Sequence, residues 1–417
     1  MIDASGERRV DVVVAGGLVV DVGVDVSMPS RAVALDAGGC VVAPGLVDLH
    51  THLREPGLEE AETVESGARA AALGGYTAIV AMPNTEPAID DASVVRHVLN
   101  LGASSCCDVR VAGAITVGRA GRQLAPLAEM AALGVRLFTD DGTGVADPRV
   151  MRRALEYASA LDVILAQHCE DTALAAGGLM NEGPLSSHLG LAGQPAAAEE
   201  VMVVRDLALC ALTGARMHFL HLSAAGSVAR VRQAKANGLA VTAEAAPHHF
   251  TLTDEAVTSY DPVFKVNPPL RRAADVAAVK AGLADGTLDA VATDHAPHPQ
   301  EAKEASFEEA PAGMIGLDAA LSLSLTELGL PVAAVLALLS WQPAAIAGID
   351  DGHGRPILAG EPANLFVFDP AERWTLDPSR SGSRSRNSPY AGRSMTGRVR
   401  HTVHKGEAVV RDGEATR

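Results

Sequence analysis

The sequence predicts an α/β protein: a (β/α)₈ barrel of the TIM type with a small β-sandwich domain formed from both chain ends. In the middle of the chain, short apolar runs alternate with segments of helical period, and at both ends short strand-like runs replace this pattern. Parallel strands buried on both faces appear as continuous apolar runs, and eight βα units over about 250 residues favour a closed barrel. A doubly wound open sheet is the alternative. Such a sheet usually carries a glycine-rich turn after its first strand, where this chain has DLHTH (48–52).

Eight runs rich in apolar and β-branched residues are the predicted barrel strands, and most of them end in polar residues. In chain order they are Val41–Leu49, Tyr76–Met82, Val109–Ile115, Val135–Phe138, Val163–Ala166, Met217–Leu220, Ala240–Ala243 and Leu288–Ala292. Segments with helical apolar spacing lie between them, for example Glu60–Leu73, Pro148–Ala160 and Ala196–Leu212. We therefore expect strand and helix to alternate throughout this region.

The two chain ends are expected to be β-rich. Alternating runs precede residue 41, and similar runs (NLFVFDP and RVRHTVHKGEAVVRDG) follow residue 351. Two β-rich flanks around a barrel pair most simply with each other. We therefore expect residues 1–43 and 350–417 to form the sandwich and residues 44–349 to form the barrel. The Ser/Arg-rich stretch Pro378–Arg386 is expected to be a surface loop.

Composition excludes several classes of protein. The chain has 417 residues, 48% hydrophobic and 20% charged, which excludes general disorder. Its net charge of −17 argues against nucleic acid as a partner, and no apolar run approaches the roughly 20 residues of a membrane span. The five cysteines are scattered without a CxxC pair, and the N-terminus lacks a signal-peptide pattern. We expect a cytoplasmic enzyme with reduced thiols that acts on a small molecule.

Histidines and aspartates collect at the predicted carboxyl ends of the strands, which converge on one mouth in a barrel of this kind. These positions are His50, His52, Arg54, Asn84, Asp140, Asp141, His168, His221, His248, His249, Asp294, His295 and His298. In an HxH pair, alternate strand residues share a face, so both imidazoles can reach one ion. Nitrogen and oxygen ligands without thiolate suit zinc or another first-row divalent ion. Two ions would need a shared anionic ligand, for which Asp140 and Asp141 are both candidates.

The motifs DLHTHLREPG, AMPNTEP, FTDDG, HCED, HLS, APHH, NPP and ATDHAPH occur in the order found in class I dihydroorotases of the amidohydrolase superfamily. The resemblance extends from Val41 through the C-terminal strands. It implies reversible hydrolysis of the cyclic amide of (S)-dihydroorotate to N-carbamoyl-L-aspartate, a step of pyrimidine (UMP) synthesis. It also implies two Zn²⁺ ions per chain.

The resemblance assigns roles to individual positions. His50 and His52 match ligands of the first zinc, and His168 and His221 match ligands of the second. Asp141 resembles the bridging carboxylate, and Asp294 resembles a first-metal ligand that is also the catalytic acid/base. The positions that match substrate-binding residues are His52, Arg54, Asn84, Asn267, His298, Ala312 and Gly313. For His248 and His249, the sequence supports no more than a role beside the metal ligands.

One segment departs from the family pattern. Residues 299–316 correspond to a segment that covers the substrate, and PAGM (311–314) stands where Pro-Phe-Gly is expected. Ala312 thus replaces an aromatic ring. This change is tolerable if backbone groups make the contact, and it lowers affinity if the ring packs on the substrate.

Two other functions are weighed against this one. Hydantoinases and allantoinases usually bridge their metals with a carboxylated lysine after the fourth strand. This chain reads GVRLFTDDG (134–142) there, without a lysine, which favours the aspartate-bridged dihydroorotases. A non-catalytic dihydroorotase-like subunit of an aspartate transcarbamoylase complex would be expected to lose metal ligands, which this chain retains. The resemblance leaves open a homodimer and an association with aspartate transcarbamoylase.

Overall fold

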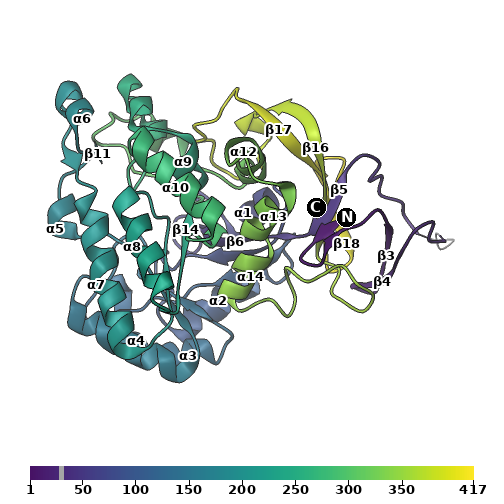
Figure 1. The fold of residues 1–417 in the computed structure, drawn as a ribbon, viewed down its shortest axis with the longest axis horizontal. Coiled ribbons are helices and arrows are strands. Elements are labelled where there is room, and N and C mark those ends of the chain that lie inside the picture. The colour runs from purple at the N-terminus through teal and green to yellow at the C-terminus, as the bar shows by residue number, and fades with distance from the viewer. Residues whose placement is uncertain (28–31) are drawn as a thin grey trace.

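A computed structural model describes residues 1–27 and 32–417 of the chain. Figure 1 shows two regions: helices surround parallel strands in one, and in the other antiparallel strands from both chain ends lie together near the two termini. The α/β class predicted from the sequence is therefore confirmed.

Each of the eight apolar runs overlaps a strand of the parallel sheets. These strands are β6 (Leu46–Thr51), β7 (Tyr76–Ala81), β8 (Asp108–Val111), β9 (Leu137–Phe138), β10 (Ile164–Gln167), β13 (Met217–Phe219), β14 (Val241–Ala245) and β15 (Ala290–Val291). They form two parallel sheets in the orders β6-β7-β8 and β15-β14-β13-β10-β9. Single parallel bridges connect the sheets at both ends, from Gly113 to Phe138 and from Thr51 to His295.

The first apolar run was expected to be one strand and is in fact two. β5 (Val41–Pro44) pairs antiparallel with a C-terminal strand, whereas β6 pairs parallel with β7. Gly45 separates them, and its N–H donates to the Asn364 carbonyl over 2.9 Å. A Cβ at this position would lie 2.1 Å from Thr77 Oγ1, so only glycine fits where the chain passes between the sheets.

Helices follow most of these strands. The longer ones are α1 (Val64–Leu73), α2 (Ala92–Gly102), α4 (Pro148–Leu161), α7 (Ala197–Thr213), α8 (Ala225–Ala236), α10 (Ala273–Asp285), α12 (Ala320–Glu327) and α13 (Val332–Leu339). The shorter ones are α3 (Leu127–Ala131), α5 (Thr172–Ala175), α6 (Pro184–Leu189), α9 (Pro247–Thr251), α11 (Gln300–Lys303) and α14 (Trp341–Ala347). α1 begins four residues later than expected from Glu60, because the Thr63 side chain caps it by accepting from Ser66 N.

The second region is built from both chain ends. β16 (Leu365–Thr375), β17 (Ser394–His404), β18 (Glu407–Arg411) and β19 (Glu414–Ala415) form an antiparallel sheet that β5 completes. β3 (Asp11–Ala15) and β4 (Leu18–Gly23) form a separate hairpin, as do β1 (Ile2–Asp3) and β2 (Gly6–Glu7). A small apolar cluster holds the hairpins against the sheet through Met1, Val19, Ile357, Ala363, Leu365 and Val403.

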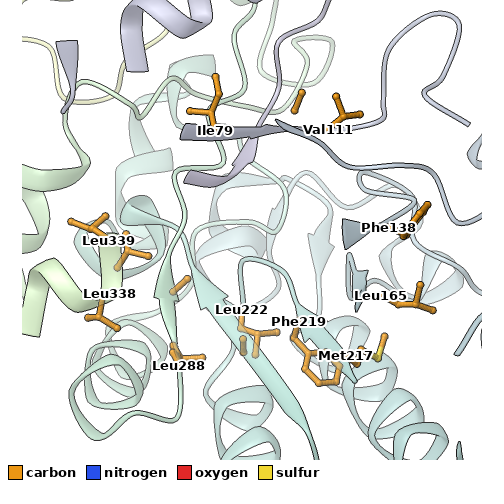
Figure 2. Packing of buried hydrophobic residues seen from close by; sticks show 14 of the residues in the cluster. Ile79, Val111, Phe138, Leu165, Met217, Phe219, Leu222, Leu288, Leu338 and Leu339 are labelled. Carbon is orange, nitrogen blue, oxygen red and sulfur yellow. The ribbon is translucent and has the colours of Figure 1, made fainter. Parts of the chain in front are cut away.

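The main apolar core lies between the parallel strands and the helices. Figure 2 shows part of it, with Phe138 and Phe219 on two of the strands and Leu338 and Leu339 on α13. Both phenylalanines are fully buried. Burial of one such side chain stabilises a fold by about 1.5–3 kcal/mol, so this layer fixes the strand ends that carry the polar residues. In the described part of the chain, no helix is both long and apolar enough to cross a membrane.

The Ser/Arg-rich stretch is not simply the surface loop that its composition predicts. Its beginning is exposed, but Ser383 and Ser385 are buried, and so are Asn387 and Ser388 directly after it. The Ser383 hydroxyl and the Arg384 N–H donate to the Glu62 carboxylate, and Ser385 Oγ donates to the Ala61 carbonyl over 2.7 Å. The serines are therefore buried because their hydroxyls have partners inside the protein.

Candidate metal centre and active site

The Asp141 carboxylate lies between two pairs of imidazoles. Its Oδ2 is 3.3 Å from His50 Nε2 and 3.6 Å from His52 Nε2. Its Oδ1 is 3.6 Å from His168 Nδ1 and 3.5 Å from His221 Nε2. One carboxylate thus presents a separate oxygen to each pair, as a ligand shared by two metal ions would.

Asp294 lies beside the first pair. Its Oδ1 is 3.2 Å from His52 Nε2 and 3.6 Å from His50 Nε2. Its other oxygen is 3.8 Å from His248 Nε2. The first group of donors therefore contains two imidazoles and two carboxylates, and the second contains two imidazoles and the shared carboxylate.

The structure distinguishes the two aspartates that the sequence left open. Asp140 turns away from the histidines, and its Oδ1 accepts hydrogen bonds from Ile115 N (2.8 Å) and Thr116 N (3.0 Å). Its other oxygen accepts from the Thr116 hydroxyl. Asp140 therefore holds the loop in place, and Asp141 faces the centre.

Residues outside the centre orient the first two imidazoles. His50 Nδ1 is 3.0 Å from Glu244 Oε1, and His52 Nδ1 is 2.9 Å from Asn84 Oδ1. A carboxylate or amide oxygen can only accept, so each Nδ1 carries the hydrogen and each Nε2 presents its lone pair to the centre. Imidazoles that bind metals are commonly oriented in this way.

Glu244 was not predicted from the sequence. It is fully buried and contacts both His50 and His218, whose Nε2 lies 3.0 Å from Glu244 Oε2. These contacts hold the pKa of Glu244 at about 2, although burial alone would raise it. Its place at the end of β14 was the available signal, because other strand ends supply the centre, but a lone glutamate in EAAPHH does not show which residue it contacts.

The residues present fit a metal centre. Each group of donors lies within 4.8 Å of one another: His50, His52 and Asp141 in one, and Asp141, His168 and His221 in the other. All are buried, and His50 Nε2 and Asp141 Oδ1 have no hydrogen-bond partner. Burial would raise the pKa of Asp141, but the surrounding imidazoles hold it well below its usual range, so the group is an anion. A buried anion among unpartnered imidazole nitrogens suits divalent cations.

Arg54 and His298 meet at the mouth of this centre. Arg54 Nε donates to the Pro297 carbonyl over 3.2 Å, and one of its terminal nitrogens lies 3.5 Å from His298 Nε2. His298 Nε2 lies 2.9 Å from the Ala312 carbonyl, so this nitrogen donates and Nδ1 is an acceptor. Burial, with the nearby Arg54 charge, lowers the pKa of His298 to about 3, so the ring is neutral.

Gly313 continues the same contact surface. Its φ is +137°, and an added Cβ would lie 2.8 Å from the Ala296 Cβ and 2.9 Å from His298 Nε2. Only glycine fits there. At Ala312, the contact that the structure shows is made by the backbone carbonyl and not by the side chain.

Asn267 lies at the opposite side of the centre. Its Nδ2 donates to Glu170 Oε2 over 2.8 Å, and Glu170 lies 3.6 Å from His168 Nε2. The Asn267 Oδ1 is buried without a partner. Glu170 is a further residue that sequence reasoning missed, although it is part of the HCED motif.

The remaining candidate histidines do not contact Asp141. His248 approaches Asp294, while His249 Nε2 lies 3.0 Å from the Pro268 carbonyl. His295 Nε2 lies 3.3 Å from Glu62 Oε2.

Three of the site residues have a backbone conformation that side chains rarely adopt. Arg54, His221 and Asp294 have φ of 63°, 31° and 47°. Such residues cost about 1–3 kcal/mol each and persist only where the surrounding structure holds them. All three follow the ends of parallel strands, where this backbone turn directs the side chain toward the mouth.

Known proteins share the sequence and the fold of this chain. A family model described as "Dihydro-orotase-like" matches residues 39–227. A dihydroorotase of Streptomyces coelicolor is 52% identical over 99% of this chain and 97% of its own length, and one of Mycobacterium tuberculosis is 47% identical over 98% and 96%. Among solved structures, an L-hydantoinase (dihydropyrimidinase) from Arthrobacter aurescens superimposes with a TM-score of 0.89 at 25% identity, covering 100% of this chain and 95% of that one.

Proposed function

The chain belongs to the dihydroorotase family, and we propose that it catalyses the reversible hydrolysis of (S)-dihydroorotate to N-carbamoyl-L-aspartate in pyrimidine biosynthesis. The observation that carries this proposal is the Asp141 carboxylate between two imidazole pairs, with Asp294 and Arg54 near the same mouth. Such a centre suits a metal-dependent cyclic amidohydrolase, the class in which a water molecule opens a ring amide.

We infer that two zinc ions occupy the centre. His50, His52 and Asp294 would hold the first, His168 and His221 the second, and Asp141 both. When bound, zinc would polarise a carbonyl oxygen and make a nucleophilic water available near neutral pH.

Asp294 is the residue to which we assign proton transfer. Burial would raise its pKa, but the neighbouring imidazoles of His52, His50 and His221 hold that pKa far below its usual value, so the carboxylate starts ionised. It can therefore accept a proton from the attacking water and pass it to the ring nitrogen that leaves. We assign both transfers to this one carboxylate.

Arg54 is the residue to which we assign the substrate carboxylate. Its guanidinium is partly buried, and its terminal nitrogens offer a planar fork that matches a carboxylate. Asn84 can use its amide nitrogen for the substrate, since its oxygen is taken by His52. His298, Asn267 and the backbone at 312–313 would complete the pocket.

The family relationship also supports a proposal about the architecture. We propose that the eight parallel strands form a closed barrel, supported by the two bridges that connect the sheets at both ends. We propose further that the β-rich ends form one sandwich domain of residues 1–43 and 350–417 around the barrel of residues 44–349. Cytoplasmic location stays a prediction from the composition, and a homodimer and an association with aspartate transcarbamoylase stay predictions of the resemblance.

The test is an assay of dihydroorotate hydrolysis with metal content measured by elemental analysis on the same sample. We expect hydrolysis and about two zinc ions per chain. A parallel panel of hydantoin, dihydrouracil and allantoin tests the hydantoinase-type alternative, because a hydantoinase shares the fold of this chain. Activity on that panel without dihydroorotate hydrolysis would overturn the proposal.

A matched pair of variants tests the bridge. Asp141→Asn removes the negative charge that offsets two cations, so we expect its metal content to fall. Asp140→Asn, one residue away, keeps an oxygen for Ile115 and Thr116, so we expect metal content to stay as in the wild type. Equal metal content in both variants would contradict the assignment of Asp141.

A further inference from the structure

A buried asparagine from the C-terminal segment, Asn387, connects two segments of the substrate pocket. Its Nδ2 donates to the Ala296 carbonyl (3.0 Å) and to the Gly313 carbonyl (3.2 Å). Its Oδ1 accepts from His298 N (3.3 Å), and its own carbonyl accepts from Ile315 N (3.2 Å). One residue thus makes two hydrogen bonds with each segment.

The two segments carry the groups assigned to the substrate. The first, residues 296–298, contains His298 and the carbonyl that receives Arg54 Nε. The second, residues 312–315, contains the backbone of Ala312 and Gly313. The segments contact each other directly, through Ala296 N to the Met314 carbonyl (2.9 Å) and through the His298 ring to the Ala312 carbonyl.

Asn387 is suited to hold them because it is itself fixed. Its side chain is buried, with the residue 7% exposed, and nearby Ser385 is anchored to the Ala61 carbonyl. The preceding Ser383 and Arg384 donate to Glu62, which also contacts His295. The C-terminal segment therefore reaches the loop after β15 in two ways: indirectly through Glu62, which contacts His295, and directly through Asn387.

We propose that Asn387 is a positioning residue that fixes segments 296–298 and 312–315 relative to each other and thereby sets the affinity for substrate. It acts through His298, Arg54 and the Gly313 backbone and does not itself touch the reacting atoms. The inference rests on the proposed function, because it assigns these segments to the substrate pocket.

Asn387 fixes the two segments because each polar atom of its side chain faces a suitable hydrogen-bond partner. The amide nitrogen of Asn387 faces two carbonyl oxygens, and its oxygen faces an N–H, so asparagine satisfies all three groups. An aspartate of the same shape would place a carboxylate oxygen against both carbonyls. The segments would then separate, while Asp141, Asp294 and the four histidine ligands would keep their positions.

The experiment compares Asn387→Asp with a matched control, Asn364→Asp. Asn364 is also buried, donates to the Gly352 carbonyl and accepts from Lys405 N, both over 2.8 Å, but lies in the β-rich region. We expect Asn387→Asp to raise KM about tenfold or more, with kcat within about threefold and metal content unchanged. We expect Asn364→Asp to lower the melting temperature and leave KM unchanged.

Asn387→Ala serves as a second variant, because it loses the same donor without adding a charge, and it should raise KM in the same direction. An unchanged KM in both Asn387 variants, in a wild type that hydrolyses dihydroorotate, would overturn the positioning role. Absence of hydrolysis in the wild type would instead overturn the proposed function. Hydrogen exchange of residues 296–316 then decides the positioning role, which requires faster exchange in Asn387→Asp than in Asn364→Asp.

Discussion

Two buried carboxylates, Asp141 and Asp294, lie within the same group of histidines and have different surroundings. Both oxygens of Asp141 face imidazole nitrogens, so this group is enclosed. Asp294 faces His52 and His50 with one oxygen, and its second oxygen approaches only His248, at 3.8 Å. The enclosed carboxylate suits a fixed ligand, and the less enclosed one suits a group that exchanges protons.

Replacement of Asp294 by asparagine tests this division. Asparagine keeps the size and one oxygen toward His50 and His52 but cannot carry a proton between water and a leaving nitrogen. We expect metal content to stay near that of the wild type and kcat to fall by about 10³-fold or more. Steady-state kinetics and elemental analysis on the same preparation measure both quantities. Full activity would remove Asp294 from its assigned role.

The candidate site could be predicted from sequence at the residues that follow strand ends. HxH, HCED, HLS and ATDHAPH gave His50, His52, His168, His221 and Asp294, and the structure places them together. The orienting partners could not be found in this way. The contacts of Glu244 and Asn387 depend on how strands and chain ends pack, and no local spacing encodes that.

At the scale of elements, Asp108 connects the parallel sheet to the C-terminal part of the chain. It begins β8, and its carboxylate contacts His353 Nε2 (3.0 Å), His404 Nε2 (3.3 Å) and Lys405 Nζ (2.5 Å). Burial would raise the pKa of Asp108, but these three donors outweigh burial and hold it far below its usual value. One carboxylate therefore links β8 to the end of β17 and to the loop after α14.

This contact gives stability a defined pH dependence. A carboxyl with a depressed pKa in the fold stabilises the protein fully above its unfolded pKa of about 3.9, and the stabilisation decreases progressively as pH falls from that value towards the folded pKa. We expect Asp108→Asn to lower the melting temperature at pH 7 by about 2–4 °C. The difference from the wild type should shrink below about pH 4. Thermal unfolding of both proteins from pH 7 down to pH 3 measures it, and a constant difference would contradict the ionic role of Asp108.

The elements show where sequence patterns succeed and where they fail. All eight parallel strands were predicted because buried strands are apolar along their whole length, whether they join a parallel or an antiparallel sheet. For the same reason, the run Val41–Leu49 gave no sign of its division at Gly45, which depends on the close approach of Thr77. The Ser/Arg-rich stretch was misjudged because composition predicts solvent exposure and cannot show that Glu62 accepts from its hydroxyl and N–H groups.

At the scale of the whole molecule, the C-terminal strands pack on the helices of the metal-binding region. Trp374 Nε1 and Ser322 Oγ both donate to the Gly397 carbonyl, over 2.9 and 2.5 Å, which joins α12 to β16 and β17. An apolar cluster continues the contact through Ala319, Leu323, Leu376, Tyr390 and Met395. Thr402 Oγ1 also donates to the Ala72 carbonyl over 2.7 Å, at the end of α1.

These contacts predict that residues 44–349 do not fold into a stable unit alone. Without the C-terminal segment, Glu62 loses its Ser383 and Arg384 donors, and Ala319 and Leu323 lose their apolar partners. Each buried group left without a partner costs about 1–3 kcal/mol, and a domain is stable by only about 5–15 kcal/mol in total. We expect this fragment to lack a cooperative thermal transition by circular dichroism, while the full chain shows one.

A second truncation provides the matched comparison. Residues 38–417 lack β1 to β4, whose apolar side chains lie mainly in the cluster around Val19 and Leu365, with Ile2 in the main core. This chain keeps Glu62, Ser383 and Asn387 together, so we expect it to unfold cooperatively at a lower temperature than the full chain and to bind the same amount of metal. If residues 44–349 unfolded as cooperatively as residues 38–417, the C-terminal segment would not be required for the stability of residues 44–349. The fold then would not need it to hold the pocket in place.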